Sequence, residues 1–115
     1  MALKLLDSLA MNTRILALLS SAILAISAFG ADTGAGKAAY DASCKKCHGA
    51  DGAANPAIAK MLKVEMKHLG SKEVQSKSDA VLKKETIEGV GKMKGLPAAE
   101  KDIANILAYV RTLKQ

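Results

Sequence analysis

The sequence predicts an all-α domain of three or four short helices joined by glycine-rich loops. Apolar residues recur at helical spacing in several segments, whereas no stretch shows the strict apolar–polar alternation of a half-buried strand. The β-branched residues are not clustered, so strands are not expected. A length of 115 residues suits one domain rather than two.

The N-terminal residues 1–30 are expected to form a secretory signal peptide. Arg14 precedes an apolar run from Ile15 to Phe29, which ends in the small-x-small sequence "AFG". The run is shorter than the roughly 20 apolar residues that cross a bilayer, and it contains three serines, so a retained membrane anchor is less favoured. Met11 is a second candidate start of translation. Cleavage would leave a single domain, residues 31–115, in the periplasm.

The first half of this domain is expected to contain two helical segments. Gly36–Cys47 reads as a short helix after a glycine-rich start, and Gly49–Pro56 reads as a loop because of its glycines and its Asn-Pro step. Beyond the loop, apolar residues recur at i, i+3, i+4 and i+11, which predicts one buried helical face made of Ile58, Met61, Leu62 and Leu69.

The second half is expected to contain two more helices. The polar stretch "GSKEVQSKS", residues 70–78, is interpreted as a solvated connection. Ser78 is placed to cap the next helix and Gly89 to end it, and residues 89–97 are irregular. Pro97 suits the start of the last helix. That helix has the clearest apolar stripe, formed by Ile103, Ile106, Leu107, Val110 and Leu113.

The composition indicates that the domain has too few bulky apolar side chains to fill a core. Aromatic residues make up only 3% of the chain, with no Trp and one Phe, and the Phe lies in the expected signal peptide. Small domains gain little stability from burying apolar surface, so another large apolar group is expected to complete the interior. The net charge of +6 could suit nucleic acid, but export and the lack of stacking aromatic residues argue against such a partner.

Both cysteines and one of the two histidines lie within the motif C-x-x-C-H, at Cys44, Cys47 and His48. Cysteines at i and i+3 lie on one face of a helical turn, where their thiols can bond to the two vinyl groups of one haem. The histidine that follows can then bind the iron through Nε2. The motif therefore predicts one covalently attached c-type haem.

Three other interpretations of the cysteines are less favoured. A thiol–disulfide redox pair is expected beside a βαβ unit, and the sequence predicts no strand. A zinc site needs four ligands, and the chain has no second cysteine pair. A structural disulfide between Cys44 and Cys47 would leave His48 and the incomplete core unexplained.

Four segments of residues 34–114 resemble a small class I cytochrome c of the exported bacterial kind. They are "GKAAYDASC" before the motif, "HGADGAANPAI" after it, "GVGKMKGLP", which is similar to the methionine loop of the family, and "DIANILAYVRTL", which is similar to its last helix. The resemblance implies the cytochrome c fold, in which three to four short helices wrap around one covalently bound haem.

The resemblance also implies roles for single residues. Pro56 matches the proline whose carbonyl accepts the Nδ1–H of the axial histidine and orients its ring. Gly36 and Tyr40 match first-helix positions that cross the last helix at Ile106 and Tyr109. A glycine at such a crossing lets two backbones approach closely.

The sixth iron ligand has four candidates: Met61, Met66, Met93 and His68. Met61 belongs to the apolar stripe and is expected to pack in the core, as most such methionines do. Met66 lies at the margin of that stripe, and His68 lies in a polar stretch typical of a solvated surface. Met93 is favoured because it stands in a glycine-rich loop, where helical packing does not explain an apolar residue.

These features together predict a soluble one-electron carrier with His48 and Met93 as axial ligands, and no enzymatic activity. The alternative is a haem enzyme or gas sensor whose sixth position is open or bound by His68. Lysines flank both haem-binding segments and predict a positive rim, which would steer the protein to acidic redox partners: an oxidase, a reductase or a membrane cytochrome complex. These lysines are Lys45, Lys46, Lys92 and Lys94. A monomer without stable membrane insertion is expected.

Overall fold

The structure, a computed structural model, describes residues 30–115, so the expected signal peptide lies outside the described residues apart from Gly30. Ala31–Gln115 form one compact unit made almost entirely of short helices. Within this part of the chain, no helix combines the length and the apolar character that crossing a membrane requires.

The chain enters the domain through α2 (Thr33–Ser43), followed by the single turn α3 (Lys45–His48). The carboxylate of Asp32 accepts hydrogen bonds from two amides of the first turn of α2, so the helix begins earlier than the predicted Gly36–Cys47. Cys44, with φ of −117°, caps the end of α2 and the start of α3 and lies in neither helix. The predicted single helix is therefore two consecutive segments.

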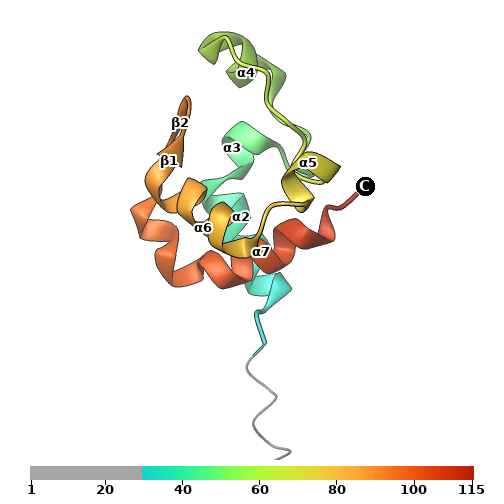
Figure 1. Cartoon of the computed structure of the whole chain (residues 1–115), viewed down its shortest axis with the longest axis vertical. Helices are drawn as coiled ribbons and strands as arrows, with labels where there is room; N and C mark the ends of the chain where they lie inside the picture. Colours follow the sequence, from blue (N-terminus) through green and yellow to red (C-terminus); the bar gives the residue numbers. More distant parts are fainter. Residues whose placement is uncertain (1–29) are drawn as a thin grey trace, which may run out of the picture. The chain divides into compact units, whose positions relative to one another are not determined.

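Helix α2 crosses the last helix, α7 (Ile103–Thr112), and this is the most extensive packing between elements in the described domain (Figure 1). A Cβ atom at the buried Gly36 would overlap the backbone carbonyl of Asn105, so only glycine allows this approach. The rings of Tyr40 and Tyr109 meet edge to face with centroids 5.1 Å apart. The predicted crossing of the first and last helices is confirmed.

The protein core is small and centres on α7. The described part of the chain has two clusters of buried residues, and α7 contributes to both. The first cluster consists of Tyr40, Cys44, Ala99, Ile106 and Val110, and the second consists of Leu82, Ile103 and Leu107. Tyr40 and Ile106 thus share one cluster, as the resemblance implied.

Helix α6 (Asp79–Glu88) has the predicted boundaries. The Ser78 hydroxyl accepts a hydrogen bond from the third amide of the helix, and Gly89 ends the helix with φ of +90°. Pro97 also starts a helix, as predicted, but the first turns, η2 (Pro97–Asp102), are 3₁₀ and lead directly into α7.

Two short elements contradict the sequence predictions. Strands β1 (Gly89–Val90) and β2 (Met93–Lys94) form an antiparallel hairpin where an irregular segment was expected, with Gly91 at φ of +56° in the turn. Strands of two residues are too short to produce a detectable alternation. The one-turn helix α5 (Lys72–Gln75) interrupts the predicted solvated connection.

The predicted buried face between Ile58 and Leu69 is wrong. Helix α4 (Pro56–Leu62) ends where Lys63 takes a left-handed conformation, with φ of +54°, so Leu69 lies outside it. None of its residues is buried, and Met61 is 68% exposed instead of packing in the core. In Figure 1, α4 stands apart from the crossing of α2 and α7.

Candidate functional site

The C-x-x-C-H motif folds into one helical turn at the junction of α2 and α3. The backbone carbonyl of Cys44 accepts hydrogen bonds from the amides of Cys47 and His48, at 3.2 and 2.9 Å. Cys44 is 9% exposed, and Cys47 and His48 are half-buried. No disulfide joins the two cysteines. The structure thus brings together the three residues that the sequence predicted to act as a unit.

Burial changes the protonation chemistry of this turn. It lowers the pKa of His48, because the charged imidazolium loses solvation. It also raises the pKa of the Cys44 thiol, to which the neighbouring Cys47 adds a smaller effect of the same sign. A neutral imidazole is the form that binds a metal ion.

The Nδ1 atom of His48 is buried and has no hydrogen-bond partner among residues 30–115. A buried polar atom without a partner is uncommon and costly, and it often marks a functional position. Pro56, the expected acceptor, is an exposed residue at the start of α4. The hydrogen bond from His48 to the Pro56 carbonyl therefore stays a prediction.

Asn55 ties the loop after the motif back to α3. Its backbone N–H donates to the carbonyl of Cys47 at 2.9 Å, and its side-chain Nδ2 donates to the carbonyl of Lys46 at 3.1 Å. Its Oδ1 also accepts from the amide of Ala57 and so caps α4. Sequence reasoning treated the Asn-Pro step only as a turn and missed this role.

Met93 lies on β2, in register with Val90 on β1, and is half-buried. The other methionine candidates differ in setting. Met66 is half-buried between α4 and α5, whereas Met61 is the most exposed of the large apolar residues described. Met93 thus belongs to a separate hairpin and not to the turn that carries His48.

His68 is half-buried, and both of its ring nitrogens have partners. Its Nδ1 accepts a hydrogen bond from the Gly70 amide at 2.8 Å, and its Nε2 lies 3.2 Å from Nε2 of Gln115. The prediction that His68 is a solvated surface residue is therefore partly wrong, because the contact with Gln115 attaches its side chain to the C-terminal segment. An iron ligand at this position would have to give up the Gln115 contact.

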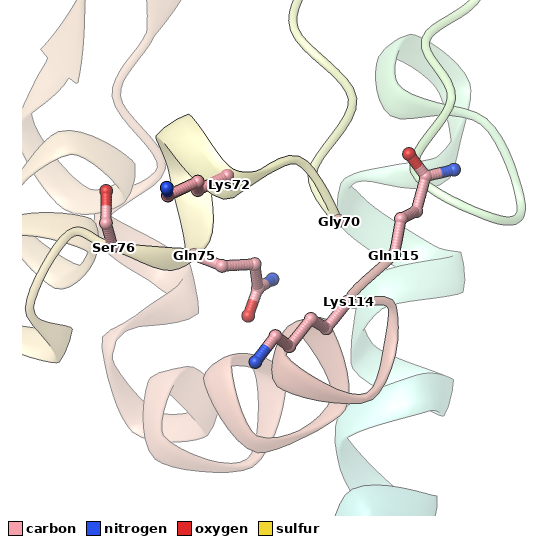
Figure 2. A pocket seen from close by; sticks show the side chains of 6 residues that line it. All are labelled: Gly70, Lys72, Gln75, Ser76, Lys114 and Gln115. Atoms are coloured by element: carbon pink, nitrogen blue, oxygen red, sulfur yellow. The ribbon is translucent and has the colours of Figure 1, made fainter.

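A surface pocket of about 350 Å³ lies elsewhere, between the α5 segment and the C-terminal end of the chain (Figure 2). It is lined by Gly70, Lys72, Gln75, Ser76, Lys114 and Gln115, and it contains none of the predicted site residues. The described residues also contain no group of three or more His, Cys, Asp or Glu side chains suited to hold a metal ion by themselves.

Comparison with known proteins decides the family. The sequence model of the cytochrome c family matches residues 34–114. The chain belongs to the cytochrome c family. It is also 36% identical over 89 residues to cytochrome c-554(547) of Halothiobacillus neapolitanus, an alignment that covers 72% of this chain and 98% of that protein. This cytochrome c is a monohaem class I member with the all-α fold of the family and one covalently bound c-type haem.

The described residues of this cytochrome c fit such a group. The motif supplies two thiols and a half-buried imidazole on one turn. Helix α4 carries Ile58, Met61 and Leu62 but buries none of them against protein. A large planar apolar cofactor would offer such side chains a surface, so the stripe is compatible with a bound haem.

Proposed function

We propose that Cys44 and Cys47 attach the haem and that His48 is one axial ligand of its iron. Each thiol would add across a vinyl group, with the sulfur bonding to one carbon and the thiol hydrogen going to the other. The observation that carries this proposal is the single turn in which Cys44 accepts both backbone hydrogen bonds, because it places two tethers and a ligand side by side.

His48 has the properties of a ligand rather than of an acid–base group. Its lowered pKa keeps the imidazole neutral, and its unpartnered Nδ1 leaves a proton available for an acceptor, for which we propose the Pro56 carbonyl. Such a hydrogen bond would fix the ring and leave Nε2 to bind the iron.

Met93 is the proposed second axial ligand. It is half-buried on a short hairpin, whereas Met61 is 68% exposed and both His68 nitrogens have partners. Met66 is half-buried as well, so the variants described below must distinguish it from Met93. A thioether sulfur raises the reduction potential of a haem relative to a second histidine.

Six-coordinate iron favours electron transfer over catalysis. Members of the cytochrome c family are typically electron carriers, and the haem, when bound, supplies a one-electron change between ferrous and ferric iron. With both axial positions taken, no site remains for a substrate, so we propose a one-electron carrier without enzymatic activity. The alternative enzyme or sensor requires an open sixth position, and reduced protein would then bind carbon monoxide readily.

The partners of this carrier are proposed to be acidic redox proteins. Lys45 and Lys46 on α3 are exposed, as are Lys92 and Lys94 on the hairpin, and none of the four forms an ion pair within the described domain. Free positive charge beside the haem-binding segments would accelerate encounters with acidic surfaces and make them salt-dependent. An electron-transfer rate that does not change with ionic strength would exclude this role.

The cellular setting is also a proposal. We propose that residues 1–30 direct export and are removed, and that residues 31–115, which form one compact unit, act as a periplasmic monomer. Mass spectrometry of the exported protein would locate the cleavage site. A mass that retains residues 1–30 would contradict the proposal.

The axial assignment is tested by Met93→Ala, with Met61→Ala and Met66→Ala as matched controls. We expect Met93→Ala to abolish the weak long-wavelength absorption band of sulfur bound to ferric iron and to lower the reduction potential. The controls should keep the band. The assignment to Met93 is wrong if the band survives in Met93→Ala and disappears in one of the controls.

A further inference from the structure

Two tyrosine hydroxyls hold consecutive carbonyl groups immediately after His48. The hydroxyl of Tyr40 donates to the carbonyl of Gly49 at 2.7 Å, and the hydroxyl of Tyr109 donates to the carbonyl of Ala50 at 3.2 Å. Tyr40 comes from α2 and Tyr109 from α7, so each of the two crossing helices donates one hydrogen bond to the segment Gly49–Ala50.

The Tyr40 hydroxyl is a fixed donor. Its residue is 0% exposed, and its ring packs edge to face against Tyr109. Burial is the main cause of a raised pKa for Tyr40, so the hydroxyl keeps its proton. A phenylalanine would fill the same space, and the hydroxyl therefore has a task besides packing.

The segment that these hydroxyls hold is the one that positions His48. The His48 amide is bound to the Cys44 carbonyl, and the His48 carbonyl accepts from Ala54 at 3.0 Å. Directly after His48 the chain reverses at Gly49, which has φ of +75°. Among the described residues, the only other donor to this carbonyl is the Gly52 amide, at a long 3.5 Å, so loss of the Tyr40 hydroxyl would loosen the turn that follows His48.

We propose that Tyr40 and Tyr109 are positioning residues for the His48 ligand, which they fix through the carbonyls of Gly49 and Ala50. This inference rests on the proposed axial role of His48. Because the Tyr40 contact is shorter and partly buried, whereas the Tyr109 contact is exposed, Tyr40 has the larger effect and Tyr109 the smaller one.

The test compares wild-type holoprotein with Tyr40→Phe and Tyr109→Phe. Each change removes one hydroxyl and keeps the ring. Hydrogen exchange is measured at the hydrogen-bonded amides of Gly49, Ala54 and Asn55 and, as an internal reference, along α2 and α7. The second readout is the set of His48 ring signals in the NMR spectrum of the oxidised protein, which report the orientation of an imidazole bound to paramagnetic iron.

We expect Tyr40→Phe to speed exchange in residues 49–55 by about tenfold, which corresponds to the loss of one hydrogen bond, while exchange in α2 and α7 changes little. The His48 ring signals should shift. Tyr109→Phe should change the same observables by a smaller factor. If Tyr40→Phe yields no folded holoprotein, Tyr109→Phe decides the question alone.

The inference is overturned if the His48 signals stay in place, or if exchange rises equally across the whole domain. The second result would assign the hydroxyls to general stability. Failure of the proposed function is separately visible, because wild-type protein would then lack covalent haem or show no iron-shifted His48 signals.

Discussion

The crossing of α2 and α7 predicts a large cost for adding a single methyl group at Gly36. The new Cβ would overlap the backbone carbonyl of Asn105 and approach the amide of Ile106 at 3.1 Å. Because these are backbone atoms, the two helices must separate. Overpacking of this kind costs about 1–3 kcal/mol, and the better helix propensity of alanine returns about 1 kcal/mol. The severe overlap places the overpacking cost near the upper end of that range. After the gain in helix propensity is subtracted, Gly36→Ala should lower the free energy of unfolding by about 2 kcal/mol.

The assay is guanidinium unfolding of the holoprotein, followed by far-ultraviolet circular dichroism. Gly36→Ala should lower the midpoint without changing the slope, and the melting temperature should fall by about 8–16 °C. Gly34→Ala is the matched control in the same helix, because its Cβ would meet only a side-chain oxygen of Asp32, at 3.3 Å. The control should be neutral or up to about 1 kcal/mol more stable. Equal stabilities of the two variants would refute the close approach.

Three further predictions use the same unfolding assay. Ser78→Ala removes the acceptor that caps α6 and should cost about 1 kcal/mol; no loss would mean that the cap is not formed in solution. Arg111 donates to the carbonyls of Gln75, at the end of α5, and of Lys77, and it pairs with Asp79. Arg111→Lys should therefore cost about 1–3 kcal/mol, and a neutral result would refute that anchoring. The hydrogen bond from Lys37 lowers the pKa of Asp41. The pair therefore stabilises the fold at pH values above the ordinary carboxyl pKa of about 4, and this stabilisation is lost as the pH falls through the lowered pKa. Asp41→Asn should therefore weaken the loss of stability in acid, and an unchanged pH profile would contradict the pair.

The sequence predicted those parts of the fold that local rules determine. Ser78 and Gly89 mark the ends of α6 because a hydroxyl cap and a positive φ are requirements of single residues. The crossing of α2 and α7 was predicted from Gly36 and Tyr40 because the family resemblance covered both helices.

The prediction for α4 failed for a physical reason. Helical spacing of Ile58, Met61 and Leu62 shows only that one face is apolar, and it does not show what covers that face. In the described part of the chain no protein core covers that face, and Met61 is exposed. A cofactor and a protein core leave the same pattern in a sequence.

Hydrogen bonds between distant segments were also beyond sequence reasoning. The bond from Tyr109 to Ala50 spans 59 positions, and nothing in the local sequence of either residue indicates it. The roles of Asn55 depend likewise on the position of α3 relative to the loop. The C-x-x-C-H turn was predictable because all of its chemistry lies within five consecutive residues.

The central claim is that one haem is covalently bound at Cys44 and Cys47, and intact mass spectrometry after extraction with acidified organic solvent tests it most directly. Covalent attachment predicts a coloured protein whose mass equals the processed chain plus one haem, before and after extraction. A double variant, Cys44→Ser with Cys47→Ser, should lose the added mass. Wild-type protein with the mass of the bare chain, or with pigment that passes into the solvent, would contradict the account.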